Sequence, residues 1–238
     1  MTNLSIVLPT YNEAKRVTAG IDFAKELATL WGKPTEILLV DDGSTDDTVA
    51  IAKSLQTSEL SILSCSHLGK GAAVCRGMLA AKGSVRLFSD IDWSVRPQEA
   101  HRMLNAMNSA DVIIASRESI GSRRLGEPLW RHLLGRVFNR WIQSTFLSGH
   151  ADTQCGCKAF TSRSAELLFS NVEEMGWAFD IELLALAHKY GLEVRDFPVT
   201  WIYDPHSSIN LIKTSSEMLR AVQNIKARMT NKVSDSLD

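Results

Sequence analysis

The sequence predicts an α/β protein with a mostly parallel sheet and flanking helices. Two observations carry this prediction. Short apolar runs alternate with helical patterns through the first half of the chain, and polar residues follow the ends of several runs. The chain has 238 residues, of which 45% are hydrophobic, and this length suits one large domain at least as well as two small ones.

Five short apolar runs are the predicted strands of the first half. They comprise residues 5–8, 36–40, 60–63, 85–88 and 112–115. Polar residues follow the first, second and fourth runs, and the carboxyl ends of parallel strands are where open α/β sheets bind ligands. We therefore expect these polar residues to converge on one crevice.

A helix is predicted between the first two strands. Its apolar residues recur at helical spacing and are Val17, Ile21, Ala24 and Ala28. Asn12 is expected to cap the start of this helix, and Gly32 followed by Pro34 is expected to end it.

The second half of the chain has a looser pattern. We expect an Arg-rich segment after residue 116, a long helix over residues 129–147, a turn at 152–156, further helices and an extended run over 193–203. A C-terminal helix is expected over residues 211–230, and residues 231–238, in which Ser and Asp alternate, are expected to form a disordered tail.

Composition excludes some classes of function. The formal net charge is −1, so nothing in the overall charge favours nucleic-acid binding. Cys65, Cys75, Cys155 and Cys157 follow no secretory leader, and we interpret them as reduced thiols of a cytoplasmic protein. No stretch approaches the roughly 18 apolar residues of a membrane span, so we do not expect the chain to cross a membrane.

Two aspartates separated by a single residue, Asp90 and Asp92, follow the fourth predicted strand. Carboxylate oxygens are preferred ligands of Mg²⁺ and Mn²⁺, and a divalent ion held there would bridge to a diphosphate. The alternative is that both side chains simply cap the following turn. The pair therefore predicts a divalent-metal site only in combination with other motifs.

A second acidic pair, Asp41 and Asp42, ends the second predicted strand ahead of Gly43. A carboxylate there can accept a hydrogen bond from an imide N–H, such as that of uracil, while the ring of Tyr11 stacks on the base. The alternative is an ordinary acidic start of a helix.

Lys70 lies between two glycines before a predicted helix, where it can approach phosphates or form part of a tight turn.

Three of these segments together resemble the family 2 glycosyltransferases: residues 8–13 (LPTYNE), 40–44 (VDDGS) and 90–92 (DID). Residues 116–117 (SR), 152–158 (DTQCGCK) and 177–184 (WAFDIELL) are similar to the dolichyl-phosphate beta-glucosyltransferase branch, with the dolichol-phosphate mannosyltransferases as close cousins. The resemblance covers about residues 4–203.

The resemblance implies a Rossmann-like GT-A domain over residues 1–230, the fold of nucleotide-diphosphosugar transferases. Residues 1–116 would form the nucleotide-sugar and metal half, and residues 117–210 the acceptor half. Asp90 and Asp92 would hold Mg²⁺ or Mn²⁺. The residues implied to bind the nucleotide-sugar are Pro9, Tyr11, Glu13, Asp41, Asp42, Lys70 and Asp90.

The activity implied is inverting transfer of a hexose, glucose from UDP-glucose, to a polyprenyl phosphate. The implied catalytic residues are Asp152, Arg117 and Lys158, and the implied acceptor side comprises Arg117, Arg131, Gln154, Trp177, Asp180 and Glu182. Asp152 is either an orienting residue or, for a hydroxyl acceptor, the general base. Two alternatives stay open: a glycosyltransferase with a soluble hydroxyl acceptor, and a non-catalytic protein that binds a nucleotide-sugar.

Six arginines against two glutamates lie between residues 117 and 140, and this local excess favours an anionic partner. The helix expected over residues 129–147 is amphipathic, with Arg136 and Arg140 on its polar face. It either lies in the membrane interface, which makes the protein peripheral, or packs its apolar face on the sheet with its arginines in water.

Overall fold

The computed structural model describes residues 2–145, 149–205 and 211–234. Its centre is a seven-stranded sheet in the order β3-β2-β1-β4-β7-β5-β8. The strands are β1 (Leu4–Thr10), β2 (Thr35–Asp41), β3 (Leu60–Ser64), β4 (Val85–Ser89), β5 (Val112–Ser116), β7 (Cys157–Thr161) and β8 (Val194–Pro198). Only β7 runs antiparallel to its neighbours in this sheet, so the predicted mostly parallel α/β architecture is confirmed.

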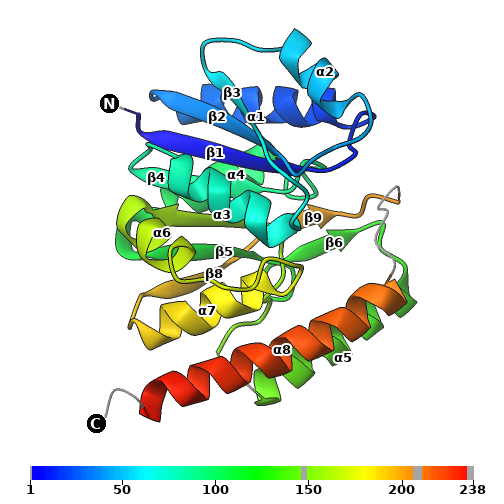
Figure 1. Cartoon of the computed structure of the whole chain (residues 1–238), viewed down its shortest axis with the longest axis vertical. Helices are drawn as coiled ribbons and strands as arrows, with labels where there is room; N and C mark the ends of the chain where they lie inside the picture. Colours follow the sequence, from blue (N-terminus) through cyan, green and yellow to red (C-terminus); the bar gives the residue numbers. More distant parts are fainter. Residues whose placement is uncertain (1, 146–148, 206–210, 235–238) are drawn as a thin grey trace.

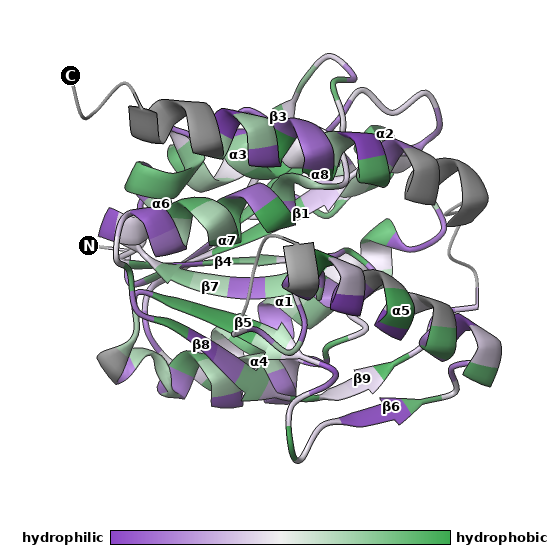
Figure 2. Cartoon of the chain, turned by 90° about the horizontal axis from the view of Figure 1, so that it is seen from below, coloured by the Kyte–Doolittle hydropathy of each residue, from purple (hydrophilic) through white to green (hydrophobic). Residues whose placement is uncertain are grey.

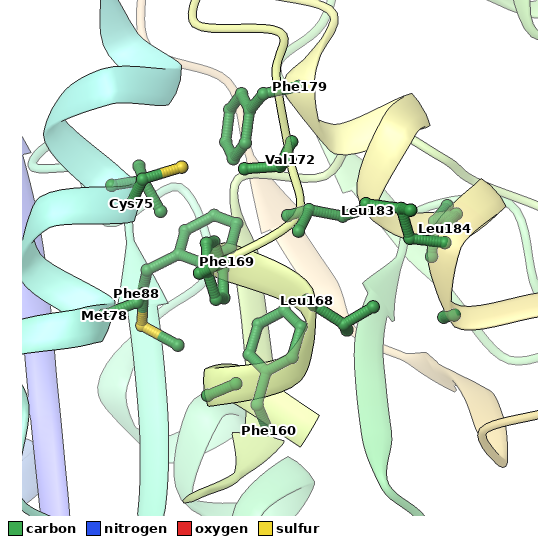
Figure 3. Packing of buried hydrophobic residues seen from close by; sticks show 14 of the residues in the cluster. Cys75, Met78, Phe88, Phe160, Leu168, Phe169, Val172, Phe179, Leu183 and Leu184 are labelled. Carbon is green, nitrogen blue, oxygen red and sulfur yellow. The ribbon is translucent and has the colours of Figure 1, made fainter. Parts of the chain in front are cut away.

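Helices cover both faces of the sheet (Figure 1). One core cluster lies under α1 (Val17–Trp31), α2 (Thr48–Ser54) and α4 (Pro97–Asn105), followed by the short turn η1 (Met107–Ser109). The other lies under α3 (Lys70–Ala80), α6 (Ser162–Phe169) and α7 (Phe179–Lys189), and α8 (Leu211–Ser234) adds Val222 and Ile225 to it. Figure 3 shows Phe88, Phe160 and Phe179 packed together in this second cluster.

The residues around α1 show one correct and one wrong prediction. Gly32 ends the helix in a left-handed conformation and donates its N–H to Ala28, as predicted. Asn12 does not cap the helix, which begins at Val17. Instead Asn12 is itself left-handed, and its side-chain oxygen accepts the N–H of Thr45, so it ties the β1–α1 loop to the loop after β2.

The extended run predicted over 193–203 is divided between two sheets. Its first part is β8, and its second part, β9 (Thr200–Ile202), pairs with β6 (Arg123–Leu125) in a separate two-stranded parallel sheet. The C-terminal helix α8 continues to Ser234, so it takes in the first residues of the segment expected to be a disordered tail. Residues 235–238 lie outside the described part.

The long helix α5 (Leu129–Thr145) is placed against the rest of the fold by its C-terminal half. Ile142 is buried, and the Asn139 and Gln143 amides donate to backbone carbonyls of Ala151 and His150. The apolar side chains of its first turns are exposed, including Leu129 at 87% and Trp130 at 63%, with Leu133 and Val137 beside them. Figure 2 shows hydrophobic residues along this helix.

The helix therefore does not pack all of its apolar face on the sheet. Leu129, Trp130, Leu133 and Val137 are exposed, whereas Asn139 and Gln143 in the C-terminal half contact the neighbouring loop. Across the described ranges, no helix combines the length and the hydropathy that a bilayer span requires.

Candidate active site

A cavity of about 270 Å³ opens at the carboxyl end of β4. Its walls come from the end of β4, the start of α3, the β5–β6 loop, α5, the turn before β7 and the segment before α7. The predicted residues that line it are Lys70, Asp90, Asp92, Arg117, Arg131, Asp152, Gln154, Trp177 and Asp180. Residues far apart in the sequence thus meet in one place.

Asp90 and Asp92 lie at the floor of this cavity. The Nζ atom of Lys70 is 2.6 Å from Oδ1 of Asp90, and Oδ1 of Asp92 accepts the N–H of Ser94. Burial raises the pKa of Asp92, and the nearby charge of Asp90 raises it further. Lys70 is partly buried, and this desolvation lowers its pKa, but Asp90 and Asp180 outweigh it and raise the pKa overall.

These residues fit a divalent cation that is shared with a ligand. No group of three or more candidate ligand side chains converges within the described residues, so the protein supplies only part of a coordination shell. Two mutually repelling carboxylates at an open cavity are suited to a cation whose other ligands are diphosphate oxygens.

Gly156 fixes the position of Asp90. Its carbonyl oxygen accepts the N–H of Asp90 at 2.8 Å, and a Cβ atom on Gly156 would lie 2.0 Å from Oδ2 of Asp90. Trp93, in a left-handed conformation and fully buried, makes the turn that follows Asp92. The approach of β7 against β4 therefore sets the direction of the Asp90 carboxylate.

Arg117 and Asp152 form a bidentate ion pair in the cavity wall. Asp152 accepts hydrogen bonds from Nε of Arg117 at 2.6 Å, from its Nη2 at 2.9 Å and from its backbone N–H at 3.0 Å. The N–H of Gln154 is a fourth donor. Burial acts to raise the pKa of Asp152, but Arg117 outweighs it and lowers the pKa to about 2.

Asp152 holds the Arg117 side chain in place in this geometry. A carboxylate with so low a pKa and four donors is a poor proton acceptor, so the role as a general base is not favoured. The arrangement holds the Arg117 guanidinium in the cavity wall, and that guanidinium also stacks over the ring of Trp201.

Lys158 does not reach the cavity, and its predicted catalytic role has to be corrected. Its side chain is fully buried in β7, where Nζ donates to the carbonyl of Cys155 at 2.8 Å and to Oδ1 of Asp180 at 2.7 Å. Because β7 runs between β4 and β5, this side chain points into the core beside Phe88. Its contact with the cavity is indirect, through Asp180.

Glu182 was expected on the acceptor side, but it also lies in the interior. Its carboxylate accepts the N–H groups of Glu173 and Glu174 and pairs with Arg228 of α8. It closes the loop ahead of α7 instead of lining the cavity. Trp177 and Asp180, five and two residues earlier in the same motif, do face the cavity, because they lie just before α7 and in its first turn.

Apart from Lys70 and Asp90, the residues predicted to bind the nucleotide-sugar do not line the cavity and lie at or just after the ends of β1 and β2. Pro9 is buried in β1 next to Val40, and both oxygens of Asp41 accept the N–H of Ser44. Asp41 thus has a structural hydrogen bond that sequence reasoning did not anticipate. Glu13 forms an ion pair with Arg16. Burial raises the pKa of Glu13, Arg16 acts to lower it, and the charges of Asp92 and Asp90 add to the rise, so the pKa is raised overall.

Asp42 and Tyr11 both contact His67, a residue that sequence reasoning did not select. The Asp42 carboxylate accepts the N–H groups of Leu68 and Gly69 and lies 2.8 Å from Nδ1 of His67. The rings of Tyr11 and His67 are stacked with centroids 4.0 Å apart.

The sequence motifs also missed Arg124 and its partners. Arg124 bridges Glu118 and Glu127 in the cavity wall and stacks over Trp201, as Arg117 does. Its position within the Arg-rich segment was the only signal. Arg131 lies over the ring of Tyr203 and donates to its hydroxyl at 3.4 Å.

The sheet order and the two-aspartate cavity at the strand ends define the GT-A class of nucleotide-diphosphosugar transferases. Two solved structures share this fold. Glucosyl-3-phosphoglycerate synthase from Mycobacterium tuberculosis, in complex with Mn²⁺, UDP and glucosyl-3-phosphoglycerate, is 21% identical, with a TM-score of 0.66 over 96% of this chain and 80% of that chain. Mannosyl-3-phosphoglycerate synthase from Rubrobacter xylanophilus is 23% identical, with a TM-score of 0.69 over 93% and 73%.

The chain belongs to glycosyl transferase family 2, whose model matches residues 5–168. Among curated relatives, the dolichyl-phosphate beta-glucosyltransferase of Dictyostelium discoideum is 29% identical over 94% of this chain and 74% of its own length. One such enzyme of Trichomonas vaginalis is 32% identical over 83% and 63%, and that of Saccharomyces cerevisiae is 30% identical over 83% and 66%. The chain thus spans between 63% and 74% of these three relatives.

Proposed function

We propose that this protein is an inverting glycosyltransferase that transfers glucose from UDP-glucose to the phosphate of a polyprenyl lipid. Mg²⁺ or Mn²⁺ at Asp90 and Asp92 would assist the transfer by stabilising the charge that develops on the departing diphosphate. The names of the curated relatives support the lipid acceptor and the sugar. The observation that carries the proposal is a single cavity with acidic and basic walls.

The acidic part of the cavity suits the donor. Lys70 is held by Asp90 where a diphosphate oxygen would lie close to both the cation ligands and the ammonium group. Tyr11 and Asp42 are the proposed contacts of the uracil base at the adjacent strand ends. Asp180 and Trp177 line the space between donor and acceptor.

The basic part of the cavity suits a phosphate acceptor. Arg117, Arg124 and Arg136 each pair with a carboxylate, whereas no carboxylate pairs with Arg131 in the part of the chain that the structure describes. Arg131 is therefore the cation most ready to receive an anionic ligand, with Arg117 fixed nearby in the same wall.

The state of Asp152 favours a phosphate acceptor over a hydroxyl acceptor. A phosphate monoester is already ionised at neutral pH and attacks without a general base, whereas a hydroxyl group needs one. The residue considered for that role, Asp152, has its pKa lowered to about 2 by Arg117.

The exposed face of α5 favours a lipid-bound acceptor. Leu129, Trp130, Leu133 and Val137 are exposed, and Arg131 and Arg136 on the same helix line the cavity. Apolar side chains flanked by arginines are typical of helices that lie in an anionic membrane interface. In this arrangement the protein is a peripheral protein of the cytoplasmic membrane face, and the lipid phosphate enters beside Arg131.

The proposal is tested by incubating the purified protein with Mn²⁺ or Mg²⁺ and a panel of UDP- and GDP-sugars, with and without polyprenyl phosphate. We expect UDP release from UDP-glucose that depends on the lipid phosphate and on the metal. Release that depends instead on a sugar or another soluble hydroxyl compound would show the soluble-acceptor function. Tight UDP binding without turnover under any condition would show a non-catalytic binding protein.

A further inference from the structure

His67 occupies a position between Tyr11 and Asp42 that resembles the expected position of a base. Its ring is stacked on that of Tyr11, with 17° between the ring planes. Its Nδ1 lies 2.8 Å from Oδ2 of Asp42 and 3.1 Å from the carbonyl oxygen of the same residue. Because both of these Asp42 atoms are acceptors, Nδ1 carries the proton and donates it.

A uracil base needs the same two contacts. Its flat ring would stack on Tyr11, and its imide N–H would donate to the Asp42 carboxylate. With centroids 4.0 Å apart, the Tyr11 and His67 rings leave no space for a base between them. The Asp42 carboxylate already accepts from Leu68, Gly69 and His67, which use three of its roughly four hydrogen-bonding directions, and His67 takes the one beside the Tyr11 ring.

We infer that His67 is a placeholder for the nucleobase: in the ligand-free protein its ring takes the stacking face of Tyr11 and the N–H site of Asp42, and the base must displace it. The inference rests on the proposed use of a uridine nucleotide and deepens it. His67 acts in this scheme as an intramolecular competitor that sets the affinity for the donor.

The surroundings allow the side chain to move while the backbone stays in place. A Cβ atom on Gly43 would lie 2.9 Å from the backbone nitrogen of His67, and one on Gly69 would lie 2.6 Å from the carbonyl oxygen of Met175. The loop is thus packed closely on both sides, and Asp42 holds its next two N–H groups. The His67 side chain, in contrast, is 55% exposed, so a change of rotamer carries the ring into solvent.

Displacement has a measurable consequence for affinity. When a binding-competent state is populated only in part, the apparent Kd rises in inverse proportion to that population. If the ring occupies the site in 70% to 90% of molecules, its removal tightens uridine nucleotide binding by about threefold to tenfold. Ligands without a base should bind equally well with or without His67.

The test measures binding of UDP, uridine and inorganic pyrophosphate by calorimetry with Mn²⁺ present, using the full chain and the variants His67→Ala and His67→Phe. We expect His67→Ala to bind UDP and uridine about threefold to tenfold more tightly, with pyrophosphate binding unchanged. His67→Phe keeps a ring for Tyr11 but has no N–H for Asp42, so its affinity should lie between the two. His101→Ala, on α4, is the matched control and should behave as the wild type.

The remaining outcomes distinguish a failure of the placeholder role of His67 from a failure of the proposed uridine donor. Weaker or unchanged UDP binding in His67→Ala, with the wild type binding UDP, overturns the placeholder and makes His67 part of the platform on which the base stacks. If neither the wild type nor His67→Ala binds UDP while both bind pyrophosphate, the proposed uridine donor fails and the placeholder fails with it. UDP binding that is detectable only in His67→Ala supports the placeholder most directly.

Discussion

The acidic side chains of the cavity differ in the donors that hold them, and this difference decides what each can do. Asp152 has four donors and a lowered pKa, so it is fixed as an anion that positions Arg117. Asp92 has one backbone donor and a pKa raised by burial and by Asp90, so it gains most from a cation. Substitutions of Asp90 or Asp92 should therefore reduce the rate of glycosyl transfer far more than they reduce the free energy of unfolding.

The substitution Asp92→Ala should abolish transfer and leave the fold intact. The hydrogen bonds of this carboxylate go to Ser94 alone among the described residues, whereas its proposed role is to hold a cation against the diphosphate. Activity at saturating Mn²⁺ and Mg²⁺, together with thermal unfolding, checks this expectation. Retention of more than about a tenth of the wild-type rate would rule out the metal role, since a metal ligand contributes several kcal/mol to the transition state.

The Arg117–Asp152 pair should contribute to stability in a pH-dependent way. Asp152→Asn leaves the buried Arg117 without a countercharge, so we expect a loss of about 3 kcal/mol in the free energy of unfolding at pH 7. The folded pKa of Asp152 is lowered, so its contribution is fully present above the ordinary value of 3.8 and is lost as the pH falls towards about 2.

Urea unfolding at pH 7 and pH 3 measures this contribution, with the double variant Asp152→Asn/Arg117→Met as the control. Removing both charges should cost less than removing Asp152 alone, because no unpaired charge stays buried. A double variant less stable than Asp152→Asn would contradict the account, as would an equal loss in Asp152→Asn at both pH values.

At the scale of elements, the antiparallel strand β7 organises the site although its own side chains contribute little to the cavity. It pairs with both β4 and β5, and the turn before it carries Asp152 and Gly156 to the end of β4. Lys158 within β7 secures Asp180 from inside the core. The acidic and basic parts of the cavity are joined through this strand.

Gly156→Ala should impair the donor site by displacing the Asp90 carboxylate. A methyl group there would lie 2.0 Å from Oδ2 of Asp90, and no positive φ of Gly156 forbids an alanine. We expect Mn²⁺-dependent UDP affinity to fall by about tenfold or more, which corresponds to about 1.4 kcal/mol. Calorimetry measures the affinity, and Gly135→Ala, whose added atom meets nothing within 4 Å, serves as the control. Equal affinities in the two variants would show that the position of Asp90 does not matter.

At the scale of the whole molecule, the first turns of α5 form an apolar, arginine-flanked surface next to the cavity. The formal net charge is −1, so attraction to an anionic membrane must come from this local surface. Such binding combines burial of apolar side chains with electrostatic attraction, and only the second part is screened by salt.

We therefore expect the protein to co-sediment with anionic liposomes at low ionic strength and to dissociate largely in high salt. Arg136→Glu/Arg140→Glu should weaken the electrostatic part, and Leu133→Glu should weaken binding at every salt concentration. Leu30→Glu, on α1 at the far end of the molecule, is the control for an exposed leucine (Figure 1). A wild-type protein that ignores anionic liposomes even at low salt would contradict the interfacial role of α5 and favour a soluble acceptor.

Much of the site could be predicted because it lies within short motifs at strand ends. Asp90, Asp92 and Lys70 were identified from local patterns, and all three line the cavity, whereas Tyr11, Asp41 and Asp42, which were expected in the same crevice, do not line it. Lys158 and Glu182 were placed wrongly, because neighbouring positions of one motif point in different directions once β7 and α7 are packed. His67 had no motif of its own, since its meaning comes from contacts with residues 25 and 56 positions earlier.

The sequence by itself determined the α/β class, the first five strands and the family, since these follow from hydrophobic periodicity and from contiguous motifs, whereas it predicted neither β6 nor β7. The tertiary structure alone decided which charged side chains face the cavity, which of the cavity arginines has no carboxylate partner among the described residues, and which face of α5 is exposed. The physical reason is that direction, burial and ion pairing depend on packing between segments distant in sequence, such as β7 against β4 and the turn at Asp152 against Arg117.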